Sequence, residues 1–80
     1  VGPLDDQAAE RLRAGFGVME ETFLRLVRRA QLEGAISRTR DALSLARYLT
    51  STVNGIMVIG KANTDRTVLD DIVRVAIASL

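Results

Sequence analysis

The sequence predicts an all-α fold of three helices, and two observations support this prediction. Apolar residues recur every three or four positions over most of the 80-residue chain, which is the period of an α-helix. The breaks between the periodic stretches are short and contain residues that commonly begin or end helices. A chain of this length forms one domain at most and buries only about 60% of its unfolded surface.

The first predicted helix runs from about Asp5 to Glu33, and Gly34 is suited to end it. Gly15 and Gly17 each weaken its middle by up to about 1 kcal/mol relative to Ala, so a break or bend there is consistent with the sequence. Its apolar side chains share one arc of about 120°. They are Leu12, Phe16, Met19, Phe23, Leu26, Val27 and Ala30. A short polar connector, residues 35–40, follows.

The second predicted helix covers residues 42–61, after Asp41 as its N-cap, and it carries two apolar stripes. The first stripe is Leu45, Leu49, Val53, Ile56 and Gly60. The second, rotated by about 100°, is Tyr48, Thr52, Gly55, Ile59 and Ala62. The polar remainder forms a narrow wedge of Arg47, Thr50, Ser51, Asn54 and Lys61. Because a small domain covers its own core with one stripe, the second stripe predicts contact with another protein surface.

A β-hairpin with a turn at Asn54 and Gly55 is the alternative for the middle of this segment. A lone hairpin would have little to pair with in this chain. The helical period also passes through Asn54 and Gly55 without a change of phase. These two arguments favour the helix.

The third predicted helix covers residues 65–80, with Thr64 or Asp65 as its N-cap. Its main stripe is Leu69, Ile72, Val73, Ala76, Ile77 and Leu80, and Val68 and Val75 widen it. The last two helices are therefore apolar around more of their circumference than the first. This contrast predicts a homodimer in which they pair with a two-fold mate as a four-helix bundle. The predicted interface residues are Tyr48, Thr52, Gly55, Ile56, Ile59, Leu69, Ile72, Val73, Ala76 and Leu80.

The composition argues against several function classes. The chain has no Cys and no His, so thiolate metal sites, the usual zinc and haem ligands and the commonest general base are missing. We therefore predict no enzyme, no catalytic residue, no metal and no cofactor. A net charge of +1 gives no bulk attraction to nucleic acid or membranes, and the lack of Cys suits a cytoplasmic setting. The uncharged run Tyr48–Gly60 is too short to span a bilayer, so no membrane contact is expected.

Three local patterns have a functional and a structural interpretation. Residues 55–62 match a phosphate-binding loop except that Ala62 replaces the hydroxyl residue, which favours two helix-packing glycines instead. Five arginines lie between positions 25 and 40, and a solvated helix end with its connector explains them better than nucleic-acid binding. The third pattern is a set of apolar residues that either form the core between the first two helices, which is favoured, or line an apolar ligand cavity. It comprises Phe16, Met19, Phe23, Leu49, Val53 and Met57.

The order of segments resembles the C-terminal half of the regulatory domain of TetR-family transcriptional regulators. The first helix ends Leu26-Val-Arg-Arg-Ala-Gln-Leu-Glu-Gly-Ala-Ile36, and Asp41-Ala-Leu-Ser-Leu-Ala-Arg-Tyr-Leu49 follows. Then come Val53-Asn-Gly-Ile56, the turn Ala62-Asn-Thr-Asp-Arg-Thr-Val-Leu69 and a terminal Val-Ala-Ile-Ala-Ser-Leu80. The resemblance covers nearly the whole chain, and its motifs are packing patterns.

The resemblance implies a two-fold bundle of the final two helices, an inducer pocket among the preceding ones and operator binding by an N-terminal helix-turn-helix domain. The chain departs from the family by lacking that DNA-binding domain and the first regulatory helices, so the pocket is expected to be incomplete. Its start at Val1, without an initiator Met, suggests a piece of a longer protein. The expected function is dimerisation and partial binding of a small apolar effector in a TetR-like repressor, with DNA contacted only through the missing domain. A helical protein-interaction module without a ligand is the alternative.

Overall fold

The computed structural model describes the main chain of residues 3–62 and 65–80 and the side chains of residues 6–62 and 65–80. It contains helices α1 (Pro3–Leu32), α2 (Ala42–Ala62) and α3 (Arg66–Ala78). The predicted all-α class is confirmed, and the observed helix ends lie within two residues of the predicted ones. Because α2 is continuous through Asn54 and Gly55, the hairpin alternative is wrong. Likewise, α1 runs unbroken through Gly15 and Gly17.

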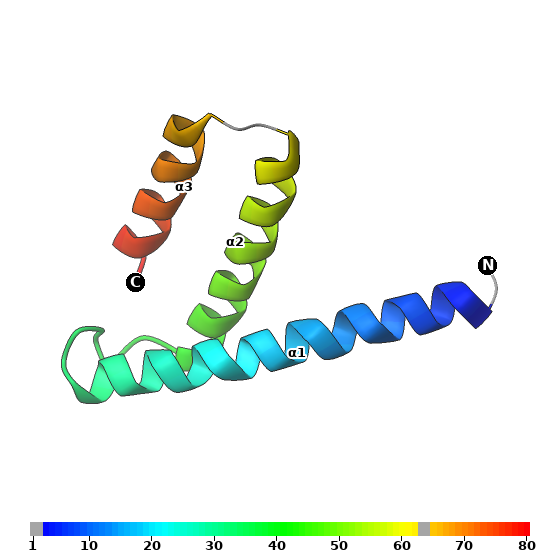
Figure 1. The fold of residues 1–80 in the computed structure, drawn as a ribbon. Helices are drawn as coiled ribbons and strands as arrows, with labels where there is room; N and C mark the ends of the chain where they lie inside the picture. The colour runs from blue at the N-terminus through cyan, green and yellow to red at the C-terminus, as the bar shows by residue number, and fades with distance from the viewer. Residues whose placement is uncertain (1–2, 63–64) are drawn as a thin grey trace.

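The three helices form a flat arrangement rather than two stacked layers. Figure 1 shows α2 rising from the C-terminal half of α1, α3 beside α2, and the N-terminal half of α1 extending past both. The Cα atoms span 47 × 29 × 13 Å, so the thinnest dimension is less than half of the next one. The radius of gyration is 15.1 Å, whereas a compact chain of this length has about 12 Å. Each face of α2 and α3 that points out of the plane thus lacks a covering layer.

The core lies at the corner where the C-terminal half of α1, the connector and the start of α2 meet. Its centre is formed by Val27, Ile36 and Leu45. Ala30, Ala42, Leu49 and Leu80 pack against this centre. The connector was predicted to be polar, but it contributes Ile36, which is buried. A single apolar residue in a polar stretch has no periodicity, so the sequence pattern could not place it in the core.

Both ends of the connector are fixed by local hydrogen bonds. Gly34, with φ of 82°, ends α1 in the left-handed conformation, as predicted. The amide of Gly34 donates to the carbonyl of Gln31 at 3.2 Å, and the amide of Ala35 donates to that of Ala30 at 2.8 Å. This pair of bonds is the Schellman pattern, which satisfies carbonyls left free at a helix end.

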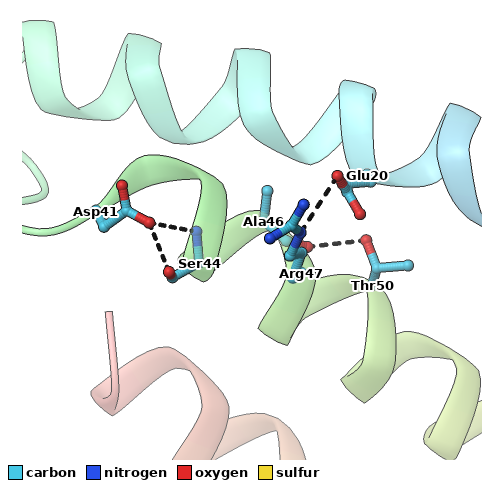
Figure 2. Close-up of polar contacts among 6 residues, drawn as sticks. All are labelled: Glu20, Asp41, Ser44, Ala46, Arg47 and Thr50. Atoms are coloured by element: carbon cyan, nitrogen blue, oxygen red, sulfur yellow. Dashed lines mark hydrogen bonds and ion pairs between the residues drawn. The ribbon is translucent and has the colours of Figure 1, made fainter.

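The predicted N-caps of the last two helices are also present. The Asp41 carboxylate accepts hydrogen bonds from the amide of Ser44 at 3.0 Å and from its hydroxyl at 2.5 Å (Figure 2). At the start of α3, the Asp65 carboxylate accepts from the amide of Thr67 at 2.9 Å. The alternative cap, Thr64, lies outside the described residues. Each carboxylate also lies at the positive end of its helix dipole, which adds to the stabilisation.

Among the described helices, α2 is long and apolar enough to cross a membrane by length and composition. In its most apolar stretch, 17% of the residues are buried within the fold. This is weak evidence for a membrane span, because helices of soluble proteins can pass the same test. The low burial of this stretch shows that α2 presents more apolar surface than its own chain covers.

Candidate functional site

An apolar groove with a volume of about 410 Å³ lies between α2 and α3. One wall comes from α2 and the other from α3, the two helices that lie side by side in Figure 1. The α2 wall is formed by Tyr48, Thr52, Gly55, Ile56 and Ile59. The α3 wall is formed by Asp71, Ile72 and Val75. We call this feature the α2–α3 groove.

The periodicity of the two helices explains why the groove is apolar. Its α2 residues recur at steps of three or four positions, with Gly55 and Ile56 adjacent, so they share an arc of about 100° on the helix. The Thr52 hydroxyl donates to the Tyr48 carbonyl at 2.9 Å, and the Asp71 carboxylate pairs with Arg74. The polar side chains are therefore engaged within their own helices. The groove presents mainly carbon surface to whatever occupies it.

The walls of the groove are far from fully covered. Tyr48 is 38% exposed and Val75 is 61% exposed, although both are large apolar or aromatic side chains. Helix α3 contacts α2 much less extensively than α1 does. A Cβ atom added at Gly55 would meet no other heavy atom within 4 Å. Gly55 thus leaves a shallow gap in the α2 wall where another backbone can approach closely.

The same part of α2 contains the segment that matches a phosphate-binding loop. Residues 55–62 are continuous helix, so their main-chain amides are engaged along α2 instead of surrounding a phosphate. No group of three acidic, His or Cys side chains suited to a metal ion occurs among the described residues. A Cβ atom added at Gly55 or Gly60 would meet no other heavy atom within 4 Å, so close helix packing at these glycines stays a prediction that concerns a partner.

Six of the ten predicted interface residues line the groove. They are Tyr48, Thr52, Gly55, Ile56, Ile59 and Ile72. The other four are placed elsewhere: Ala76 is buried, Leu69 and Leu80 are half-buried, and Val73 is 41% exposed but not in the lining.

Two groove residues were missing from the predicted set. Val75 had been identified only as widening the stripe of its helix, and Asp71 was assigned to the polar side. The two residues are four positions apart, so they share a helix face. This four-residue spacing could have shown from the sequence that Asp71 lies beside the apolar Val75 on one face of the helix.

The residues suggested for an apolar ligand cavity are not brought together around one hollow. Only Phe16 lines a hollow between α1 and α2, of about 290 Å³, whose other lining residues are polar: Glu20, Arg47, Thr50, Ser51 and Asn54. Met19, Phe23, Leu49 and Val53 are half-buried, and Met57 is 55% exposed. The Met19 sulfur lies 3.8 Å from the side-chain nitrogen of Asn54, which places it at the α1–α2 contact.

Polar groups of α2 face α1. Arg47 forms an ion pair with Glu20 of α1 at 3.5 Å, and the buried Thr50 donates its hydroxyl to the Ala46 carbonyl at 2.8 Å (Figure 2). The Arg47 side chain is 63% exposed, so the pair contributes only about 0–1 kcal/mol. Thr50 is 7% exposed. Thr50, part of the polar wedge of α2, can therefore be buried inside the fold, because its hydroxyl donates to a carbonyl of its own helix.

Among the described residues, Asp41 is the titratable group whose pKa is clearly shifted. Hydrogen bonds from the side chain and then the amide of Ser44 lower the pKa of Asp41 below its ordinary value of 3.8. Burial opposes this shift slightly, and the charge of Arg47 supports it. The shift is explained by the N-cap of α2, so it indicates helix stabilisation instead of acid–base chemistry.

The groove is therefore a surface suited to burying apolar side chains of another helix. Its walls are helical, its Thr52 and Asp71 side chains are engaged within their own helices, and Gly55 leaves open space on the α2 wall. Compared with known proteins, the chain matches no family model, no curated protein and no solved structure.

Proposed function

We propose that this chain is a dimerisation region, and that the α2–α3 groove of one copy packs against the same groove of a second copy. The observation that carries the proposal is the groove itself, which is open, apolar and lined by six residues that the helical pattern selects for self-association. Two helices from each copy would form a four-helix bundle around the joined grooves. Such a bundle supplies the second layer that a flat three-helix chain lacks.

The exposed surface area of the chain is large enough for an interface with a second copy. The chain exposes 6121 Å², whereas a compact monomer of 8.7 kDa exposes about 4,700 Å². The excess is about 1,400 Å², and a stable dimer buries about 800 Å² from each partner. A second copy can therefore cover the groove and still leave the N-terminal half of α1 in solvent.

A second copy also matches the groove chemically. In an isologous contact the same patch meets itself, so carbon surface meets carbon surface without an unpaired charge at the centre. The net charge of +1 gives little repulsion between copies. The Asp71–Arg74 pair at the edge belongs to one helix and does not need the partner. These features favour a homodimer over a strongly charged partner.

We further propose that the dimer serves a TetR-like transcriptional regulator, in keeping with the resemblance of its segments to that family. An effector bound near α1 and α2 would shift these helices against the bundle and change the spacing of DNA-binding domains elsewhere in the regulator. A ligand can do so only if it binds one arrangement more tightly than the other. The hollow beside Phe16 is the candidate for part of that effector site.

Sedimentation equilibrium of the whole chain tests the dimer. We expect a dimer at tens of micromolar, and we expect Ile59→Asp to weaken association at least about tenfold, because a carboxylate would be buried without a partner. Met57→Asp is the matched control, since Met57 is exposed and lies about 160° from the centre of the groove face of α2. It should leave association unchanged.

Three results would overturn the proposal that two copies pair through the α2–α3 groove. The first is a strict monomer at tens of micromolar. The second is equal weakening by Ile59→Asp and Met57→Asp, which would move the contact away from the groove. The third is a monomer that binds phosphatidylcholine vesicles and loses this binding with Ile59→Asp, because a lipid surface would then be the occupant of the apolar face.

A further inference from the structure

Arg40, in the connector between α1 and α2, contacts the far end of α3. Its Nη2 atom donates to the main-chain oxygen of Ser79 at 2.7 Å, and its Nη1 atom donates to that of Leu80 at 3.3 Å. Helix α3 ends at Ala78, so both acceptors follow its last turn. One guanidinium therefore joins two segments that are about forty residues apart in the sequence.

The chemistry of this contact is favourable. The last carbonyl groups of a helix have no partner within it, and they carry the negative end of the helix dipole. A guanidinium is permanently charged and presents several N–H donors in a fixed plane, so it can serve two adjacent carbonyls at once. Lys can place a charge there, but it cannot reproduce the planar pair of donors.

Arg40 is itself held in place by α1. The Gln31 side chain, in the last turn of α1, donates to the carbonyl of Arg40 at 2.9 Å and to that of Ser37 at 3.1 Å. The turn at Gly34 fixes the start of the same connector. A continuous set of hydrogen bonds thus runs from the end of α1 through the connector to the end of α3.

Few other contacts hold α3. It packs lightly against α2, and Leu80 just beyond it rests against the core at the corner. Val75 lies four residues before Ser79, which is about one helical turn from the anchored end. Ile72 lies about one turn further along. The anchored end of α3 is therefore within about two helical turns of the α3 residues that line the groove.

We propose that Arg40 is a positioning residue for self-association: it holds α3 at the separation from α2 that a second copy requires. This inference rests on the proposed use of the groove for dimerisation. Arg40 lies in the connector and does not line the groove, so it acts on a partner only through α3. Through Gln31 and Arg40, α1 is linked to the end of α3 and thus indirectly to the association surface.

The test compares Arg40→Gln and Arg40→Lys with Arg38→Gln. Arg38 lies in the same connector and donates to the Gln31 carbonyl at 3.3 Å, so its replacement removes a similar charge without touching α3. Amide hydrogen exchange is measured on dilute, monomeric chain, and the dimer dissociation constant is measured by sedimentation equilibrium. Exchange in α1 and α2 reports whether each variant is folded.

We expect Arg40→Gln to speed exchange in α3 and to raise the dissociation constant, each about three- to tenfold, while exchange in α1 and α2 stays unchanged. Arg40→Lys should fall between wild type and Arg40→Gln, and Arg38→Gln should match wild type. The inference is overturned if α3 exchange is the same in Arg40→Gln and Arg38→Gln. It is also overturned if α3 exchange rises while dimerisation does not change. If wild type never dimerises, the proposed function fails, and α3 exchange alone decides whether Arg40 positions this helix.

Discussion

The corner between α1, the connector and α2 encloses its apolar side chains, whereas the groove between α2 and α3 leaves comparable side chains in solvent. At the corner, Val27 is 2% exposed and Leu45 is 5% exposed. In the groove, Tyr48 is 38% exposed and Val75 is 61% exposed. Three segments surround the corner, but only two helices bound the groove, and they lie in one layer.

The difference teaches that one helix can carry two kinds of apolar surface with different purposes. Helix α2 contributes Leu45 to the corner and Ile59 to the groove. The first contact stabilises the single chain, because it is complete within that chain. The second is covered less completely, because Ile59 is half-buried in the single chain, and the proposed second copy would complete the contact. Substitutions in the two regions should therefore separate folding from association.

The largest effect is expected at the corner. Leu45→Ala should lower the free energy of unfolding by about 2–4 kcal/mol, because it leaves a cavity among buried side chains. Val75→Ala in the groove should cost less than about 0.5 kcal/mol in the monomer, where its side chain is exposed. Urea unfolding of dilute chain measures both. Equal losses of unfolding free energy in Leu45→Ala and Val75→Ala would show that the corner and the groove contribute equally to the stability of the single chain.

Gly55→Ala should have opposite effects on the monomer and on the dimer. In the monomer a Cβ at this position meets nothing within 4 Å, so the helix gains up to about 1 kcal/mol of stability. In the dimer the added methyl group would occupy the gap in the α2 wall, so we expect association to weaken about threefold to tenfold. Thermal unfolding of dilute chain and sedimentation equilibrium report the two effects separately.

Gly15→Ala is the control for Gly55→Ala. Gly15 also has open space around it, but it lies in α1 and does not line the groove. The Gly15→Ala substitution should raise helix stability by a similar amount and leave the dimer dissociation constant unchanged. If Gly55→Ala strengthens the dimer as much as it stabilises the monomer, the partner does not approach this glycine.

A smaller loss is expected at the turn that closes the corner. Gly34→Ala should lower the free energy of unfolding by about 1 kcal/mol, since φ of 82° is unfavourable for a residue with a Cβ. Gly17→Ala, at an open position inside α1, should instead stabilise the chain. Circular dichroism during urea unfolding compares the two. A stabilising Gly34→Ala would mean that the connector can adopt another path.

The smallest effect concerns pH at the start of α2. Because the pKa of Asp41 is lowered in the folded chain, its contribution is fully present above 3.8 and is lost as pH falls through the lower, folded value. Asp41→Asn keeps an N-capping side chain without a titrating group. Thermal unfolding near pH 6 and pH 3 should therefore show a smaller acid-dependent loss in Asp41→Asn than in wild type. The same loss in both would assign the acid sensitivity to other carboxylates.

The sequence alone predicted most of the local structure. The helix ends depend on a few neighbouring residues, so Gly34 and Asp41 could be recognised directly. The α2 wall of the groove was also predictable, because residues three or four apart share a helix face. Val75 and Asp71 were missed because the periodic pattern of α3 does not specify which part of its circumference faces α2.

The tertiary structure alone decided which apolar surfaces are covered. It placed Ile36 of the connector in the core, turned the polar Thr50 inward and brought Arg40 to the end of α3. It also left Met57 exposed and outside the hollow that Phe16 lines, although both residues were suggested for one cavity between the first two helices. The physical reason is that periodicity depends on neighbours within a helix, whereas burial depends on how many segments from distant parts of the chain meet at one point.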